Sequence, residues 1–307
     1  MIRVVGKRGR GTVEEQLDEA AKGVDFVRID CTSGNPDAEM REGLSPFYLG
    51  PVDTYDGMKA ARFERAWQCS KVLAGFTDSA GNPTSEWFAW RDRMWADASN
   101  CDHMAIRYPL GKANLKHTMY SFWKVGDTYR HLSYIEARKH IYLPVYARAV
   151  VKTSAYRRLC AMRDAGKNLL LVDFDGYNPH LPRYNFTYND VIHCPLLKMG
   201  HGFVLAMLLE GVIKVDEAGV ITYAEGLMDD PHKHYSPDLR KLTEAQKLAR
   251  NAATACVSVE EWGRLSDAER RMLKAAAKKD QVAAMGMTKA AWRRLPLVDK
   301  LAMVCGL

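Results

Sequence analysis

The sequence of 307 residues lacks the features that mark secreted and membrane proteins. Its seven cysteines form neither a CxxC pair nor an even set for a disulfide framework, and no signal-like apolar segment follows the basic amino terminus. The longest apolar run, GFVLAMLLEGVI, has about a dozen residues, whereas a membrane-spanning helix needs about 20. We therefore expect a protein of the reducing cytoplasm with no membrane partner.

Metal-binding patterns are also missing. His232 and His234 in PHKHY are close enough in sequence to act as two ligands, but no cysteine or aspartate pair stands nearby at ligand spacing. A solvated loop explains these histidines better. We therefore predict no structural zinc, no catalytic metal and no other cofactor.

The positive charge of the chain is concentrated at one end. Of the net charge of +7, residues 238–307 carry +6, because fourteen Lys and Arg stand there against eight Asp and Glu. The first 237 residues are nearly neutral. Attraction to a polyanion should come from this tail, so nucleic acid is an expected partner of residues 238–307.

Residues 238–307 also contain an internal repeat. The segments SVEEWGRLSDAERRML (258–273) and TKAAWRRLPLVDKLAM (288–303) align without gaps and share a Ser/Thr, a Trp, an Arg and a Leu. Ser258 and Glu261 have the spacing of a capping box, which marks the start of a helix. We predict a basic helical repeat module, which either docks nucleic acid or a partner, or is a helical cap that completes the fold.

The first 237 residues are predicted to form one domain of mixed structure. Strands are expected at RVVG and DFVRID, with a helix over residues 12–23 between them, and KNLLLVDFDGY is the clearest buried strand. The predicted fold class is α+β, mainly helical around a small sheet.

Three longer helices complete the predicted domain. One runs from about Tyr55 to Lys71, and a second covers residues 134–163 with a break near Pro144. The third is the apolar helix FVLAMLLEGV. The first of them carries the most informative motif of the chain.

In FERAWQCSKV (63–72), three different polar side chains share one helix face. Glu64, Gln68 and Lys71 fall within a sector of about 60° when each residue adds 100° around the helix. A cleft wall would gather a carboxylate, an amide and an ammonium in this way. A solvated helix face accounts for the pattern equally well, and the rest of the chain has to decide.

A second candidate site lies at the start of the apolar helix. Gly200 and Gly202 flank His201 there, and they expose backbone N–H groups suited to an anion or to the polar edge of a ligand. The preceding loop contributes Asp190 and His193. Polar side chains and a helix start within one connection are typical of a binding site.

These motifs, in this order, resemble the NADAR superfamily, whose members include N-glycosidases of riboflavin-biosynthesis intermediates and enzymes that remove ADP-ribose from guanine. The resemblance covers residues 44–212 and rests on LSPFYLGP, FERAWQCSKV and NDVIHCPLLKMGHGFVLAMLLEG. Glu64, Gln68 and Lys71 match the Glu, Gln and Lys of the central family motif with unchanged spacing.

The chain departs from the family pattern at several positions. Arg65 stands where the family has His, and Ser45 lacks the following Asn. Asp190 and His193 resemble the Asp and Trp of a later motif, so His replaces Trp there, and His201 sits near the expected Asn. These changes leave the central motif intact and affect positions that would line the base or ribose pocket.

The resemblance implies an N-glycosidase that cleaves the ribosyl C1′–N bond of a nucleotide or ADP-ribosyl compound, with ADP-ribosylated guanine in nucleic acid as one candidate. Such cleavage passes through an oxocarbenium-like state, so Glu64 would stabilise positive charge or activate water. Lys71 would bind a phosphate or ribose hydroxyl, or attack C1′ as a neutral amine. Asp190 would orient ribose hydroxyls or act as a second carboxylate. The remaining expected substrate contacts are Phe47, Tyr48, Trp67, Gln68, His193, Gly200, His201 and Gly202.

Two other classes of function stay open. A catalytically inert NADAR-like domain would bind an ADP-ribosyl or modified-nucleobase ligand, and the changed motif positions favour it. A nucleotidyl or glycosyl transferase would use Asp173 and Asp175, which share one face at a strand end, with a divalent metal. Acids at a strand end also act as simple caps and turn formers.

Overall fold

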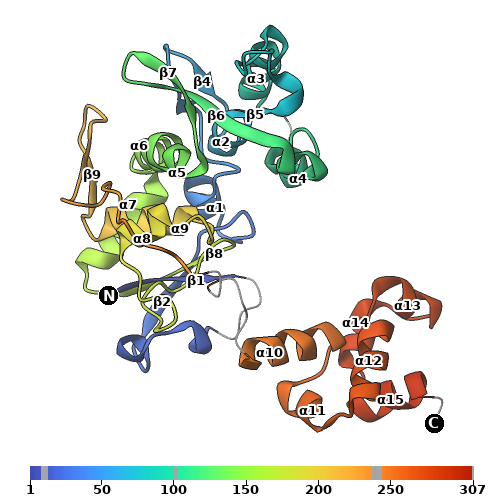
Figure 1. Cartoon of the computed structure of the whole chain (residues 1–307). Helices are drawn as coiled ribbons and strands as arrows, with labels where there is room; N and C mark the ends of the chain where they lie inside the picture. The colour runs from blue at the N-terminus through green and yellow to red at the C-terminus, as the bar shows by residue number, and fades with distance from the viewer. Residues whose placement is uncertain (8–12, 100–101, 237–238, 240–243, 306–307) are drawn as a thin grey trace. The chain divides into compact units, whose positions relative to one another are not determined.

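The computed structural model divides the chain into two compact units (Figure 1). The larger unit consists of Met1–Lys7 and Leu17–Ser236, and the helical unit consists of Arg8–Gln16 and Pro237–Leu307. The predicted boundary lay after residue 237. The residues that the structure describes are 1–7, 13–99, 102–236, 239 and 244–305.

The larger unit contains a three-stranded parallel sheet in the order β1–β8–β2. The strands are β1 (Ile2–Gly6), β8 (Asn168–Asp173) and β2 (Phe26–Asp30). The central strand β8 is buried along nearly its whole length, as its run of Leu and Val predicts. Because all three strands are parallel and in register, Asp30 and Asp173 lie at the same edge of the sheet.

The helix expected between the first two strands is not formed. The chain instead makes two 3₁₀ turns, Glu14–Gln16 and Glu19–Ala21. Between them, the Asp18 carboxylate accepts hydrogen bonds from Arg3 at 2.7 Å and from Asn178 at 2.9 Å. These hydrogen bonds hold the Asp18 side chain against the sheet, where it is buried. In the predicted helix the same side chain would have faced solvent.

A second sheet contains three antiparallel strands, β5 (Lys71–Leu73), β6 (Thr118–Val125) and β7 (Thr128–Leu132). The helix predicted from Tyr55 to Lys71 is much shorter, because α2 covers only Phe63–Cys69. All seven residues of α2 are buried, including its polar ones. Lys71 lies beyond this helix and is the first residue of strand β5. Its backbone carbonyl accepts a hydrogen bond from the Trp87 indole at 3.0 Å.

The break predicted near Pro144 is also absent. The chain stays helical through α5 (Tyr134–Ala137), a π-helical turn (Arg138–Tyr142) and α6 (Leu143–Val150). The wider π turn accommodates Pro144, which has no N–H to donate. The interruption comes later, before α7 (Ser154–Asp164).

Helix α9 (His201–Leu209) is buried at every residue and packs against the parallel sheet through β1 and β8. Helix α6 covers another side of α9. This packing explains why the segment is apolar all round its circumference. The remaining elements of the larger unit are α1 (Ala38–Leu44), β3 (Val52–Asp53), β4 (Lys59–Ala60), α3 (Ser85–Ala96), α4 (His103–Arg107), α8 (Tyr188–His193), β9 (Ile213–Val215), β10 (Ile221–Tyr223) and the 3₁₀ helices Ala74–Phe76 and Lys112–His117.

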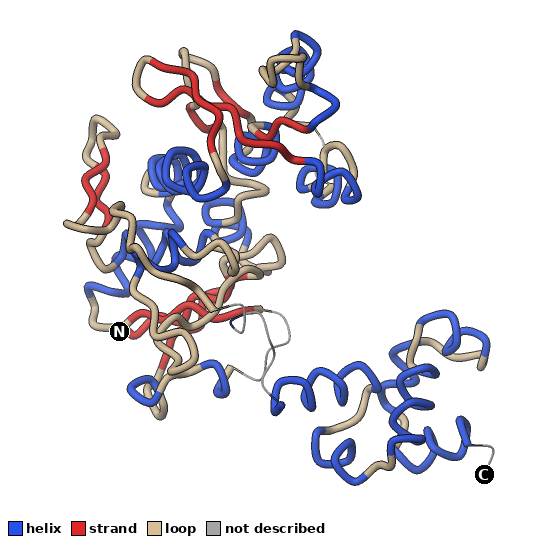
Figure 2. Tube along the Cα trace, viewed as in Figure 1, coloured by secondary structure: helices blue, strands red, loops and turns tan. Residues whose placement is uncertain are grey.

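Among the described residues, strands occur in the larger unit alone (Figure 2). Trp262 and Trp292 are both buried in one apolar cluster of the helical unit. The capping box at Ser258 and Glu261 is present, as predicted. The helices of this unit are α10 (Glu244–Ala255), α11 (Val259–Arg264), α12 (Asp267–Ala276), α13 (Lys279–Ala284), α14 (Lys289–Arg294) and α15 (Leu297–Cys305).

The predicted α+β class is confirmed by this mixture of helices and small sheets. Within the described ranges, no helix combines the length and the apolar character needed to cross a bilayer.

Candidate functional site

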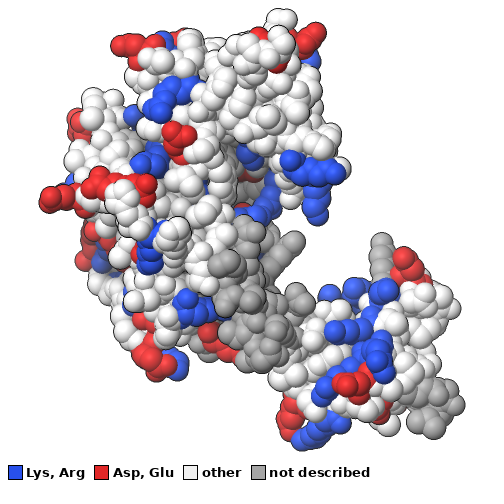
Figure 3. Space-filling model, in the orientation of Figure 1, with Lys and Arg blue, Asp and Glu red and all other residues white. Residues whose placement is uncertain are grey.

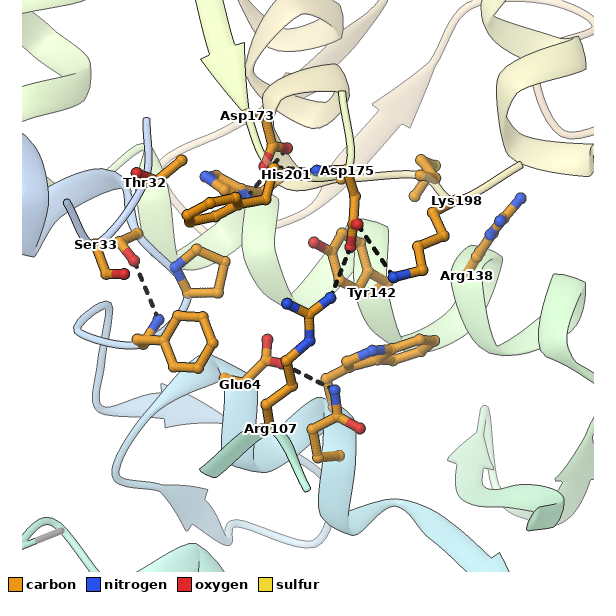
Figure 4. A pocket seen from close by; sticks show the side chains of 18 of the residues that line it. Thr32, Ser33, Glu64, Arg107, Arg138, Tyr142, Asp173, Asp175, Lys198 and His201 are labelled. Atoms are coloured by element: carbon orange, nitrogen blue, oxygen red, sulfur yellow. Dashed lines mark hydrogen bonds and ion pairs between the residues drawn. The ribbon is translucent and has the colours of Figure 1, made fainter. Parts of the chain in front are cut away.

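A cavity of about 180 Å³ opens in the larger unit at the carboxyl ends of β2 and β8 (Figure 4). Ligands of parallel sheets bind at this edge, because the loops that leave the strands diverge there. Helix α2, the loop before α9 and the start of α5 supply the other walls. The lining includes Thr32, Ser33, Ser45, Phe47, Glu64, Trp67, Gln68, Lys71, Arg107, Tyr134, Arg138, Tyr142, Asp173, Asp175, Lys198, Gly200 and His201.

Glu64, Gln68 and Lys71 form a hydrogen-bonded chain on one wall. Gln68 Nε2 donates to Glu64 Oε1 at 2.8 Å, and Lys71 Nζ donates to Gln68 Oε1 at 2.5 Å. Glu64 is only 7% exposed. The amide of Gln68 therefore connects a buried carboxylate to an amine, with its oxygen toward the amine and its nitrogen toward the carboxylate.

Burial changes the protonation of both ends of this chain. It raises the pKa of Glu64, although the hydrogen bond from Gln68 and the charge of Lys71 act in the opposite direction. Burial also lowers the pKa of Lys71 to about 8, against the charge of Glu64. A substantial fraction of Lys71 is therefore neutral near physiological pH, and a neutral amine is nucleophilic.

The glycines predicted to offer N–H groups to a ligand hold Asp173 instead. The backbone N–H of Gly202 donates to Asp173 Oδ2 at 2.9 Å. A Cβ at position 200 would lie 2.0 Å from the same oxygen, so no larger residue fits there without displacement. The positive end of α9 is thus occupied by a carboxylate of the protein itself. Gly200 and His201 line the cavity, and Gly202 lies behind Asp173.

The His201 imidazole lies between two acceptors. Its Nε2 is 2.7 Å from the Cys31 carbonyl oxygen, and its Nδ1 is 3.3 Å from Asp173 Oδ2. Because a carbonyl oxygen only accepts, Nε2 must carry a hydrogen. The Asp173 carboxylate and the His201 ring are therefore neighbours at the floor of the cavity, at ion-pair distance.

The rim of the cavity carries two cations around one carboxylate. Asp175 Oδ2 is 3.3 Å from Arg107 Nη2, and Asp175 Oδ1 is 3.2 Å from Lys198 Nζ. Both cationic side chains remain partly open to solvent, and Figure 4 shows them converging on Asp175. An incoming phosphate could replace this carboxylate as their partner.

Buried Arg138 positions the loop that leads to the cavity. Its guanidinium donates to backbone carbonyls of four residues in this loop and in the end of α8, and it is only 1% exposed. The four carbonyls belong to Val191, Ile192, Cys194 and Leu197. The hydrogen bonds of this one side chain therefore hold the segment before Gly200 in place.

Besides Gly202, three of the predicted site residues lie outside this lining. The Asp190 carboxylate caps its own helix α8 and accepts a hydrogen bond from Lys233 at 2.9 Å. His193 is buried, and its Nδ1 contacts the Asn189 carbonyl. The Tyr48 ring packs edge-on against a neighbouring histidine ring. These side chains have local structural partners and do not face the cavity.

The sequence reasoning missed the other half of the site. Arg107 and Arg138 stood in no motif, Lys198 stood within the segment NDVIHCPLLKMGHG but was not selected, and the aromatic walls Tyr134 and Tyr142 looked like ordinary helix residues. A usable signal was present after β2, where polar loop residues directly follow a strand. That signal becomes specific only when the parallel pairing of β2 with β8 is known.

The two acids considered as metal ligands have protein partners. Asp173 is bound by His201 and Gly202, and Asp175 by Arg107 and Lys198. Within the described part of the chain, no group of three or more His, Cys, Asp or Glu side chains is placed to hold a metal ion.

Comparisons with protein-family models, with curated proteins and with solved structures give no match.

Proposed function

We propose that the protein is an N-glycosidase that hydrolyses the ribosyl C1′–N bond of a nucleotide-like compound. The observation that carries this proposal is the Glu64–Gln68–Lys71 chain, which places a buried carboxylate and an amine of lowered pKa on the wall of one cavity. The motif resemblance to the NADAR superfamily supports it, since these three residues keep the family spacing.

The shape and charge of the cavity suit a nucleotide. Phe47, Trp67 and Tyr134 offer aromatic surface on which a base can stack. Arg107 and Lys198 offer cations to a phosphate at the rim. A ribose between base and phosphate would then lie near Glu64 and Lys71. Guanine that carries ADP-ribose is one compound of this class.

Two routes to cleavage use the same side chains. In the first, ionised Glu64 takes a proton from water, whose oxygen bonds to C1′ as the C1′–N bond breaks. In the second, the neutral amine of Lys71 bonds to C1′, and water later hydrolyses the adduct and frees the amine. In both routes the leaving base takes the electron pair of the broken bond and gains a proton. In the first route this proton balances the one that Glu64 takes from water, and in the second it balances the one that Lys71 loses when its amine bonds to C1′.

Release of free base or ADP-ribose from a panel of ribosyl compounds, including ADP-ribosylated guanine in DNA, tests the proposal. We expect turnover by the wild type and a loss of about 100-fold or more in Glu64→Gln and in Lys71→Ala. Lys59→Ala is the matched control, because Lys59 is exposed and pairs only with the exposed Asp53. Borohydride trapping of an adduct on Lys71 separates the second route from the first. Unchanged turnover in both cavity variants would refute the assignment.

One observation favours an inert binding domain as a second candidate. Arg65, at the position of the family His, is buried and pairs with Asp97 at 2.7 Å, and His193 lies outside the cavity lining. Neither residue supplies the family's side chain to the cavity. Tight binding of ADP-ribose that survives Glu64→Gln, without turnover of any compound in the panel, would establish this candidate.

A further inference from the structure

Several basic side chains of the helical unit serve its fold. Arg270 and Lys300 occupy matched positions in the two aligned segments 258–273 and 288–303. Arg270 donates to the Trp262 carbonyl at 3.1 Å, and Lys300 donates to the Leu295 carbonyl at 2.7 Å, so each caps the end of the preceding helix. Arg264 forms an ion pair with a glutamate one turn earlier in α11. These cations are already engaged within the fold.

Two other cations line an open groove beside α12. Arg271 and Lys274 stand one turn apart on this helix, and neither forms an ion pair with any residue that the structure describes, although Lys274 Nζ lies 5.4 Å from the centroid of the Trp262 ring. The groove measures about 390 Å³ and also contains the Asn251 amide and Arg270. Among the described residues of its lining, the one acid is Asp267, which is 85% exposed and pairs with Arg270 at 3.3 Å. Positive charge therefore exceeds negative charge in the groove.

We propose that this groove binds the phosphate backbone of a nucleic-acid duplex. Charge complementarity is the first reason, because two cations one turn apart, with no ion-pair partner among the described residues, can each meet a phosphate. Figure 3 shows Lys and Arg side chains gathered on the visible face of the helical unit. The net charge agrees, since residues 238–307 carry +6 of the +7 of the chain.

The burial of the aromatic residues favours a duplex over a single strand as the ligand of the groove. Proteins that bind single strands without sequence preference stack the bases on exposed aromatic side chains. Trp262 and Trp292 are the only aromatic residues of 238–307, and they are 2% and 0% exposed. Trp262 lines the groove but is too buried for a base to stack on it, so contacts are limited to phosphates, and the groove should bind duplexes of any sequence. This binding does not depend on the proposed glycosidase activity.

Fluorescence anisotropy of the full chain with a labelled DNA duplex of about 20 base pairs, measured over a salt series, tests this assignment. We expect the wild type to bind at low salt. In the double variant Arg271→Gln/Lys274→Gln, the slope of log K against log salt should fall by about two. Arg264→Gln/Lys59→Gln removes the same charge from paired side chains and should keep the wild-type slope. Arg271→Lys should also keep it, because the charge remains.

Four outcomes would overturn the proposal. They are no binding of the duplex at low salt, equal loss of slope in both double variants, tighter binding of a single strand of the same length, and displacement of the duplex by polyglutamate at equal charge. Equal loss would assign the effect to net charge, and displacement would assign the groove to an acidic protein. The glycosidase assay with a free nucleotide is independent of each outcome, because the cavity and the groove belong to different units.

Discussion

The amine of Lys71 should titrate near pH 8, and this can be measured residue by residue. Burial lowers its pKa from 10.5 to about 8. At about pH 7.5, roughly a quarter of a group with this pKa is neutral, against about one in a thousand for an ordinary lysine. Pulse labelling with an amine-acylating reagent over a pH series, followed by peptide mass spectrometry, gives the midpoint of reactivity. The exposed Lys59 reports the behaviour of the reagent in the same digest.

The neighbouring carboxylate determines the direction of a second shift. The charge of Glu64 raises the pKa of Lys71, so Glu64→Gln should move the labelling midpoint to lower pH, by about one unit. The unfolded chain, with an ordinary lysine, binds more protons between about pH 8 and 10.5 than the folded chain does. The stability of the wild type relative to Lys71→Met should therefore rise with pH across this window. A midpoint near 10.5, or an upward shift in Glu64→Gln, would refute the reasoning.

Three further predictions concern the floor of the cavity and its supports. Gly200→Ala places a Cβ 2.0 Å from Asp173 Oδ2, and we expect a loss of about 1–3 kcal/mol in denaturant unfolding. Gly75→Ala meets nothing within 4 Å and is the control, so an equal loss there would contradict the explanation. Asp190→Asn should cost about 1 kcal/mol through the helix cap and leave base release unchanged. If folded Asp190→Asn protein lost turnover, Asp190 would have to be counted among the site residues after all. Arg138→Lys should cost about 3 kcal/mol or more, because one ammonium cannot serve four carbonyls, and a melting curve that does not move would argue against it.

The central motif could be predicted from the sequence, but the reason why its three side chains lie close together could not. Periodicity predicted that Glu64, Gln68 and Lys71 share the face of one helix. The structure ends that helix at Cys69 and starts a strand at Lys71. The three side chains still line one cavity, because hydrogen bonds through Gln68 connect them. Helical periodicity cannot detect a strand that begins directly after a short buried helix.

The other side of the cavity depends on contacts between distant parts of the chain. Asp173 was recognisable as the end of a buried strand, yet its partners His201 and Gly202 lie about 30 residues later in the chain, and His201 in turn contacts the Cys31 carbonyl near the other end of the domain. Asp190 was misplaced for a related reason. A carboxylate three residues after Thr187 satisfies a capping box as well as a catalytic motif, and the local use prevails in the structure.

The floor and the rim of the cavity differ in how firmly the fold holds them. Asp173 is held by the backbone N–H of Gly202 in α9, His201 contacts the carbonyl of Cys31 directly after β2, and a glycine is required beside them at position 200. Arg107 is the last residue of the short helix α4, Lys198 stands in the loop before α9, and both side chains form an ion pair with Asp175. Substitutions at the rim can therefore change which ligands enter without disturbing the groups below. In evolutionary terms, or in directed evolution, ligand preference should diverge first at these two positions, while the floor tolerates almost no change.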